Sequence, residues 1–85
     1  MVYDFEIYSK PNCTYCEQAK ALIKSRGLAY RELIIDVGQP KETDKNYVTV
    51  HELKSRVPDA KSVPQIFKGS DYVGGYDALK KILAA

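Results

Sequence analysis

Along the N-terminal half of the chain, the spacing between apolar residues changes twice. Apolar and polar residues alternate over residues 2–9, which predicts a first strand with one buried face. From residue 14 to residue 26 the apolar positions recur at helical spacing, and Thr14 with Glu17 fits a capping box at the start of a helix. Residues 30–37 contain the run Leu-Ile-Ile, which is typical of a strand covered on both faces. Strand, helix and strand in this order predict a right-handed parallel crossover.

The C-terminal half predicts a loop, a short helix, a hairpin and a final helix. Residues 38–46 are polar and lack a period, so we interpret them as a surface loop. A second capping-box pattern, Thr-x-x-Glu, opens a short helix over residues 49–56. Residues 64–73 predict two strands around a Gly-Ser-Asp turn, and the last helix starts near Asp77. The resulting order, β-α-β-α-β-β-α, predicts an α/β fold.

Length and charge narrow the classes of protein to consider. A chain of 85 residues predicts a single domain over residues 1–85 with one modest core. A net charge of +2 is too small to favour binding to nucleic acid or to an anionic membrane. The N-terminus lacks a basic region followed by an apolar one, and no apolar run approaches membrane-spanning length. We therefore expect a cytoplasmic monomer without a nucleic-acid or membrane partner.

The two cysteines of the chain, Cys13 and Cys16, stand between the first predicted strand and the first predicted helix. Thiols at positions i and i+3 in the first turn of a helix share one face, where a small disulfide ring can close and reopen. Because Cys13 precedes the helix, we expect it to face solvent and to act as the nucleophile. Cys16 lies inside the turn and becomes the resolving thiol, which attacks the mixed disulfide formed on Cys13.

The thiolate form of Cys13 must be stabilised for this chemistry. A cysteine with an ordinary pKa of about 8.5 is only roughly 3% thiolate at pH 7, and only the thiolate attacks a disulfide. A helix dipole alone supplies about 0.3 to 2 kcal/mol, too little for a large shift. Free N–H groups of Tyr15 and Cys16 in the first turn, together with the cation of Lys10, are the further partners that the sequence offers.

Three less reactive interpretations of the cysteine pair compete with the redox one. A structural zinc site needs two more soft ligands, and the chain has one histidine, His51, and no further cysteine. A permanent disulfide fits poorly with the absence of a secretory signal, and so short a loop stabilises little. Two unrelated core cysteines are also possible, but their neighbours Lys10, Asn12 and Thr14 are not core residues. The redox interpretation is favoured over all three.

Three motifs, in addition to the order of the elements, connect the chain to a known family. They are Tyr8-Ser9-Lys10 before Cys13-Thr14-Tyr15-Cys16, then Ser62-Val63-Pro64-Gln65-Ile66-Phe67, and then Gly74-Gly75-Tyr76-Asp77. Over nearly its whole length the chain resembles the glutaredoxins, small oxidoreductases with a thioredoxin fold. The resemblance implies a four-stranded mixed sheet flanked by three helices, with helices on both faces. It also implies a cis peptide before Pro64, beside the cysteines.

The resemblance further implies that glutathione binds as reductant and co-substrate, with no permanently bound cofactor and no metal. The backbone of Val63 can pair with the extended tripeptide as a strand would. Lys10 can meet the glycine carboxylate, and Tyr15 can pack along the cleft. Asp77 and the N–H groups at the helix start can receive the γ-glutamyl end. The glutathione-binding residues implied in this way are Lys10, Tyr15, Val63, Pro64, Gly75, Tyr76 and Asp77.

Plainer roles compete at several of these positions. Asp77 also fits an N-cap, Gly74 and Gly75 fit a tight turn, and Pro64 fits an ordinary trans proline at the start of an edge strand. His51 could face the glycine end of the tripeptide, although it is more often an exposed helix residue than a ligand. The prediction of glutathione binding does not depend on His51.

Two departures from the common pattern of the family keep alternatives open. Thr14 stands where the commonest dithiol motif has proline, and loss of that proline sometimes accompanies an iron–sulfur cluster shared by two chains through glutathione. The loop over residues 38–47 is also long. We predict a glutathione-dependent thiol–disulfide oxidoreductase acting on protein disulfides and glutathione mixed disulfides, with ribonucleotide reductase as one conceivable client. The alternatives are an iron–sulfur cluster carrier using Cys13, and a thioredoxin-like reductant served by a flavoprotein reductase.

Overall fold

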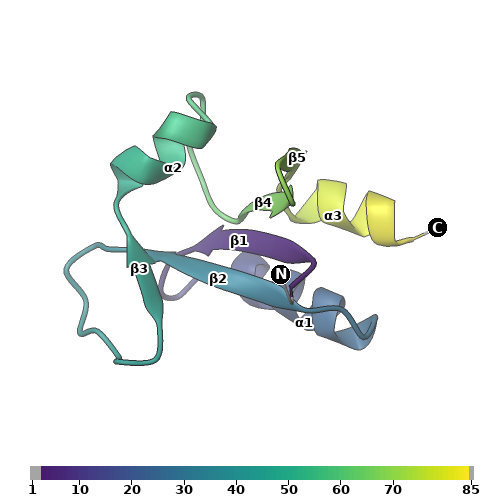
Figure 1. Cartoon of the computed structure of the whole chain (residues 1–85), viewed down its shortest axis with the longest axis horizontal. Coiled ribbons are helices and arrows are strands. Elements are labelled where there is room, and N and C mark those ends of the chain that lie inside the picture. Colours follow the sequence, from purple (N-terminus) through teal and green to yellow (C-terminus); the bar gives the residue numbers. More distant parts are fainter. Residues whose placement is uncertain (1–2, 85) are drawn as a thin grey trace.

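The computed structural model describes residues 3–84, in which strands and helices alternate much as predicted (Figure 1). The first predicted strand begins at Val2, outside the described residues. The elements are β1 (Phe5–Ser9), α1 (Thr14–Ser25), β2 (Tyr30–Ile35), β3 (Asn46–Val48), α2 (Val50–Arg56), β4 (Gln65–Lys68), β5 (Asp71–Gly74) and α3 (Tyr76–Leu83).

The strands form one mixed sheet in the order β3-β2-β1-β4-β5. β1 runs parallel to β2, with Phe5 opposite Tyr30, as expected for the strand-helix-strand unit. β4 pairs antiparallel with β1 on its other side, with Ile7 opposite Ile66. β5 then closes the predicted hairpin with β4. β1 is therefore central, and the loop that leaves its end is fixed to the middle of the sheet.

The sheet has five strands within the described residues, so the prediction of four strands was wrong. The additional strand, β3, pairs parallel with β2 at the edge of the sheet, with Ile34 opposite Tyr47. Three residues are too few to show an alternating pattern, and the sequence analysis therefore placed the start of this strand in the surface loop. The Tyr47 hydroxyl accepts a hydrogen bond from the Glu42 N–H at 2.8 Å, which ties the preceding loop to this edge.

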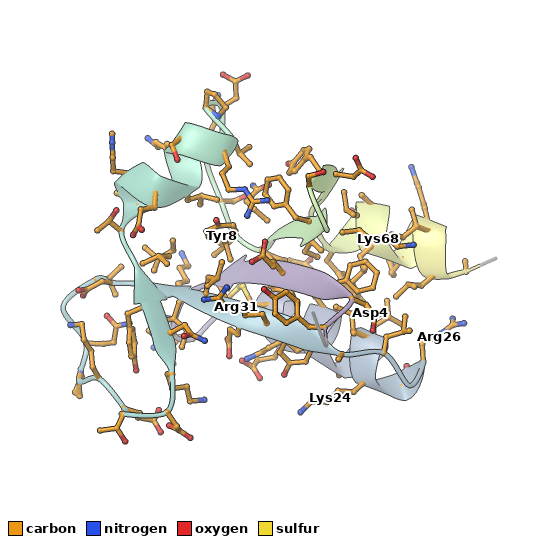
Figure 2. The ribbon with its side chains drawn as sticks, in the orientation of Figure 1. Asp4, Tyr8, Lys24, Arg26, Arg31 and Lys68 are labelled. Atoms are coloured by element: carbon orange, nitrogen blue, oxygen red, sulfur yellow. A yellow bond between two sulfur atoms is a disulfide. The ribbon has the colours of Figure 1, made fainter. Side chains whose placement is uncertain are left out.

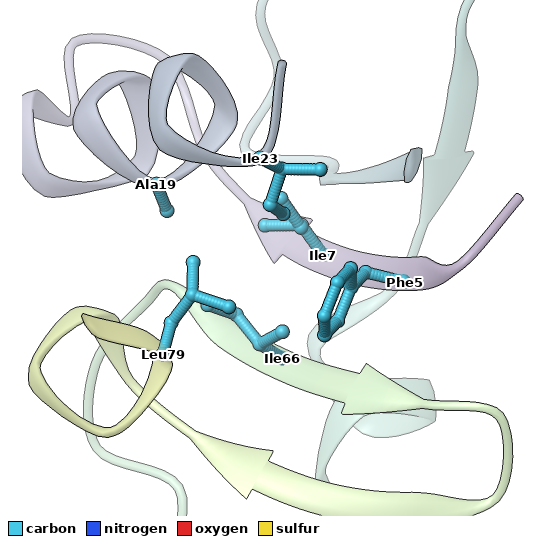
Figure 3. Close-up of a cluster of buried hydrophobic side chains, with 6 residues drawn as sticks. All are labelled: Phe5, Ile7, Ala19, Ile23, Ile66 and Leu79. Carbon is cyan, nitrogen blue, oxygen red and sulfur yellow. The ribbon is translucent and has the colours of Figure 1, made fainter. Parts of the chain in front are cut away.

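Helices cover both faces of the sheet, as the resemblance implied (Figure 1). α1 and α3 lie on one face, and α2 lies on the other. Burying these faces removes apolar surface from water and holds the helices to the sheet. The core under α1 and α3, drawn in Figure 3, consists of Phe5, Ile7, Ala19, Ile23, Ile66 and Leu79. The core under α2 consists of Tyr8, Leu33, Ile35, Leu53, Ala60 and Phe67.

The helix starts differ in how well the sequence predicted them. The capping box of α2 is confirmed, because Thr49 Oγ1 accepts from the Glu52 N–H at 3.0 Å and Glu52 Oε2 accepts from the Thr49 N–H at 2.7 Å. The capping box predicted from Thr14 and Glu17 is wrong. Cys13 is the N-cap of α1, and its sulfur accepts the N–H of Cys16, so Thr14 is already inside the helix.

A cluster of aromatic and charged side chains joins α2 to the face of the sheet that this helix covers. Arg56 at the end of α2 lies over the Phe67 ring, with 3.7 Å from its Cζ to the ring centroid. Its guanidinium donates to Glu6 Oε1 at 2.9 Å and to the Tyr8 hydroxyl at 3.2 Å. Figure 2 shows Tyr8 and Arg31 on the neighbouring strands β1 and β2. These contacts tie α2 to β4 and to β1, the strand that leads into the loop before α1 (residues 10–13), which we call the redox loop.

Candidate redox site and ligand grooves

The two cysteines form a disulfide at the N-terminus of α1, with their Cα atoms 5.2 Å apart. Cys16 is fully buried and Cys13 is 9% exposed. The prediction that Cys13 faces solvent was therefore too strong, because the segment around Val63 packs over it; Cys13 Sγ lies 3.7 Å from the Val63 carbonyl oxygen. Of the two sulfurs, Cys13 is still the one an incoming thiol or disulfide can reach, through a shallow hollow that it lines with Asn12, Thr14 and Glu17.

The Cys13 sulfur receives direct support from the helix start. The N–H of Cys16 donates to Cys13 Sγ at 3.2 Å, one of the two first-turn donors that the sequence offered. An N–H aimed at this sulfur stabilises the thiolate more than the thiol, and the positive end of the helix dipole acts in the same direction. Asn12, just before the nucleophile, has a left-handed backbone with φ of 58°, a conformation that asparagine tolerates better than most residues.

A groove beside the cysteines brings together most of the residues that the resemblance implied. We call it the α3 groove; it is lined by Tyr15, Ser62, Val63, Pro64, Gly75, Tyr76, Asp77 and Ala78. These residues come from α1, from the segment before β4 and from the start of α3. The Val63–Pro64 peptide is cis, as the resemblance implied, and the Gln65 side chain donates to the Ser62 carbonyl at 2.8 Å and anchors this segment.

Asp77 lies at the second position of α3, so its interpretation as an N-cap was wrong. Gly75 is the N-cap, and no side chain bonds to this helix start. The first N–H groups of α3 are consequently free to receive an anion. The Asp77 side chain is 90% exposed and lies 3.7 Å from Lys80 Nζ. Gly74 has φ of +122°, which a side chain would strain, so this glycine is required by the turn itself.

Two aromatic rings border the α3 groove. Tyr15 is 62% exposed, and its ring centroid lies 6.0 Å from that of Tyr76. Lys80 Nζ lies 5.0 Å from the centre of the Tyr76 ring. An exposed tyrosine pair of this kind offers apolar surface along the groove, next to the free N–H groups at the start of α3.

Lys10 lies outside the α3 groove and in a second groove that continues from it. We call this the α2 groove; it shares Ser62 and Val63 with the α3 groove and is completed by Lys10, Ile35, Val50, Leu53, Lys54, Ala60 and Lys61. Val63 thus stands between the two grooves and beside Cys13. Lys10 is exposed and free to meet a carboxylate at this end of an extended ligand. His51 is exposed on α2 and lines neither groove.

The sequence prediction missed a charged cluster behind the redox loop. Glu32 Oε2 accepts from Ser9 Oγ at 2.6 Å and from Lys20 Nζ at 2.8 Å, and Lys20 also pairs with Glu17 at 2.7 Å. Burial by itself would raise the pKa of Glu32, but the bonds from Lys20 and Ser9 outweigh it and hold that pKa below its ordinary value. A carboxylate directly before the apolar run Leu33-Ile34-Ile35 was the available signal.

Two negative findings apply to residues 3–84. No set of three histidine, cysteine, aspartate or glutamate side chains in this range is placed to hold a metal ion. The same residues include no helix that is both long and apolar enough to cross a membrane.

The fold and the site together define a class of protein. A mixed sheet with helices on both faces, a Cys-x-x-Cys disulfide at the start of α1 and a cis proline beside it are the features of a thioredoxin-fold thiol–disulfide oxidoreductase. Comparison with known proteins narrows the class. Residues 5–73 match the family model for glutaredoxin, and the chain belongs to the glutaredoxin family.

Individual relatives agree with this assignment. The chain is 39% identical over 74 residues to glutaredoxin 3 of Escherichia coli K12, covering 87% of this chain and 78% of that protein. It is 35% identical over 78 residues to the hybrid peroxiredoxin hyPrx5 of Haemophilus influenzae, covering 92% of this chain but only 28% of that longer protein.

Solved structures show the same architecture. A solution structure of glutaredoxin from Brucella melitensis matches with a TM-score of 0.68 and 32% identity, covering 98% of this chain and 80% of that one. A buckwheat glutaredoxin–glutathione complex matches with a TM-score of 0.70 over 96% of this chain and 69% of that one. At 24% identity, the buckwheat structure supports the fold alone.

Proposed function

We propose that this glutaredoxin is a glutathione-dependent enzyme that reduces protein disulfides and glutathione mixed disulfides. The observation that carries the proposal is the junction at Val63. There the reachable sulfur of the redox pair meets a groove with an aromatic wall, the backbone of the segment before β4 and the free N–H groups of a helix start. A γ-glutamyl tripeptide attached through its central cysteine presents groups that match these three features.

The reductive half of the cycle uses both cysteines. The Cys13 thiolate attacks one sulfur of the substrate disulfide, so that bond breaks and a mixed disulfide forms, while the released thiolate takes a proton. The Cys16 thiolate then attacks Cys13 Sγ and expels the second substrate thiolate. The product is the Cys13–Cys16 disulfide, the oxidised form that the structure contains.

Two glutathione molecules return the enzyme to its dithiol form. The first thiolate attacks Cys13 Sγ, which frees Cys16 and leaves glutathione on Cys13. The second attacks the sulfur of that bound glutathione, which forms oxidised glutathione and regenerates the Cys13 thiolate. Two electrons pass from two glutathiones to one substrate disulfide. In this scheme Asp77 receives the γ-glutamyl ammonium, the free N–H groups of α3 receive its carboxylate, and Lys10 receives the glycine carboxylate.

Ribonucleotide reductase stays a prediction for the protein client. The peroxiredoxin named in the Haemophilus influenzae relative adds a second class of client to test, a peroxiredoxin disulfide. A reducing compartment such as the cytoplasm suits an enzyme of this kind, because its glutathione pool keeps the dithiol form populated.

Single cysteine variants test the division of labour between the two thiols. Cys13→Ser should lose all activity, because it removes the nucleophile. Cys16→Ser should still transfer glutathione between a mixed disulfide and a second glutathione, a cycle that never uses the resolving sulfur. It should reduce an intramolecular protein disulfide poorly, since only external glutathione can then release the mixed disulfide. Equal loss of both activities in Cys16→Ser would favour an obligate dithiol cycle like that of a thioredoxin.

A further inference from the structure

The α2 groove differs in charge from four other hollows of the described residues. Three lysines line it, Lys10, Lys54 and Lys61, and no carboxylate does. Four other hollows around the sheet and the redox loop each include at least one aspartate or glutamate. Within residues 3–84, none of the three lysines has a carboxylate within 4 Å. The groove therefore presents three ammonium groups that form no direct ion pair within the described residues.

The floor of the α2 groove is apolar. Ile35, Leu53 and Ala60 lie beneath it and belong to the buried core under α2. Val50 at the start of α2 is 54% exposed, which leaves an aliphatic side chain in solvent at the groove. A partner that covers Val50 gains hydrophobic stabilisation, while its carboxylates can reach the surrounding ammonium groups. A segment with both apolar and acidic side chains is complementary to this combination.

The position of the groove connects it to the nucleophile. Val63 lines both grooves, and its carbonyl oxygen lies 3.7 Å from Cys13 Sγ. Lys10 lies three positions before Cys13 and lines the α2 groove as well. A polypeptide whose cysteine is bonded to Cys13 can therefore place neighbouring residues over α2.

We propose that the α2 groove selects disulfide-bearing proteins in which acidic and apolar side chains flank the attacked cysteine. The proposal rests on the oxidoreductase function above and adds a substrate preference to it. Lys54 and Lys61 attract the acidic side chains, and Val50 contacts the apolar one. Opposite charges at an exposed surface mainly raise the rate of productive encounter and disfavour basic partners.

Cyclic peptides with one internal disulfide provide the test. Three peptides share a scaffold and differ only beside the cysteines, with Asp-Leu, Asn-Leu or Lys-Leu. Their kcat/KM values are measured with glutathione, glutathione reductase and NADPH at low salt. The kcat/KM value for each peptide reports attack by Cys13, and the same re-reduction of the enzyme by glutathione follows with every peptide. Glutathione binding therefore cancels in the ratio of the kcat/KM values of two peptides. The wild type should prefer the Asp-Leu peptide to the Lys-Leu peptide about tenfold in about 0.01 M salt, and much less in about 0.3 M salt.

Variants assign the preference to the α2 groove. K54E/K61E should abolish or reverse the preference, whereas K54R/K61R should keep it. K68E/K81E is the matched control, with the same change in net charge. Lys68 lies at the hairpin of β4 and β5 (Figure 2), Lys81 lies in α3, and neither lines a groove. The control should retain the wild-type ratio.

The outcomes separate this proposal from the proposed function. Equal kcat/KM for the acidic and basic peptides in the wild type, or an unchanged ratio in K54E/K61E, would overturn the role of the groove while leaving the enzyme activity intact. Failure of the wild type to reduce any of the peptides with glutathione would contradict the oxidoreductase function for such substrates and overturn both. Loss of the ratio in K68E/K81E would show that net charge, rather than the α2 groove, sets the preference.

Discussion

Glu32 connects the stability of the fold to the redox loop. Its Oε2 atom accepts hydrogen bonds from Ser9 at 2.6 Å and from Lys20 at 2.8 Å. The side chains of Glu32 and Lys20 are only 18% and 14% exposed. Ser9 ends β1, one residue before Lys10, so this carboxylate ties the origin of the redox loop to β2 and α1. Replacing Glu32 with glutamine keeps the size of the side chain and removes its charge.

The expected loss follows from these contacts. A hydrogen bond to a charged group contributes about 1.5 to 3 kcal/mol when it is well shielded. Partial exposure and the remaining bond to the amide place the cost of Glu32→Gln at about 2 kcal/mol at pH 7. In a domain of this size each 1 kcal/mol changes Tm by about 4 to 8 °C, so Tm should fall by roughly 8 to 16 °C.

The lowered pKa of Glu32 predicts the direction in which this stability difference changes with pH. Burial disfavours the charged form of Glu32, but the bonds from Lys20 and Ser9 hold its pKa in the folded state below the ordinary value of 4.5. The folded state therefore binds fewer protons than the unfolded state as pH falls. The stabilisation is complete above pH 4.5 and is lost as pH falls through the folded-state pKa. The difference between wild type and Glu32→Gln should be full at pH 7 and should shrink in strong acid.

Urea denaturation of the reduced proteins, followed by far-UV circular dichroism at pH 7 and at about pH 3, measures this difference. Glu17→Gln is the control, since Glu17 is the other partner of Lys20 but is 70% exposed. It should cost at most about 0.5 kcal/mol. The explanation fails if Glu32→Gln is as stable as Glu17→Gln at pH 7, or if its deficit is the same at both pH values.

Further predictions concern the ligand and the nucleophile. Asp77→Asn should raise KM for glutathione about tenfold and should leave use of a small uncharged dithiol unchanged. Tenfold is the lower end of the effect expected from losing a charged hydrogen bond, because the Asp77 side chain is exposed. Equal loss with both reductants would make Asp77 a structural residue only. Lys10→Gln should raise the pKa of the Cys13 thiol, measured by thiolate absorbance against pH, because it removes a cation near the redox pair. An unchanged titration would assign the stabilisation of the thiolate to the helix start. Leu79→Ala should lower the free energy of unfolding by about 2 to 5 kcal/mol, measured by urea denaturation, since Leu79 is fully buried between α3 and the sheet; a loss below about 1 kcal/mol would contradict this packing.

The elements with strong local signals could be predicted from the sequence. The strand before Lys10 alternates clearly, and the cysteine pair stands at the change to helical spacing, so the redox site and its helix were predicted together. β3 could not be found in this way. It has three residues, and its identity as a strand depends on backbone pairing with the edge of β2, which local sequence does not encode.

The candidate site was predictable where a motif marked it and not elsewhere. Tyr15, Val63 and Asp77 come from separate motifs, and the fold brings them to one groove. The coverage of Cys13 by Val63, fifty residues further along the chain, depends on tertiary packing and was missed. The pairing of Ser9 and Lys20 with Glu32 and the gathering of lysines in the α2 groove were missed for the same reason, because each joins elements that are distant in sequence.

The choice of electron donor tests the central claim most directly. The wild-type enzyme is given a small glutathione mixed disulfide as substrate. Its turnover is measured in one assay with glutathione, glutathione reductase and NADPH, and in a parallel assay with thioredoxin reductase and NADPH but no glutathione. Glutathione dependence predicts rapid turnover in the first assay and almost none in the second. Efficient turnover with thioredoxin reductase, together with no dependence on glutathione, would contradict it.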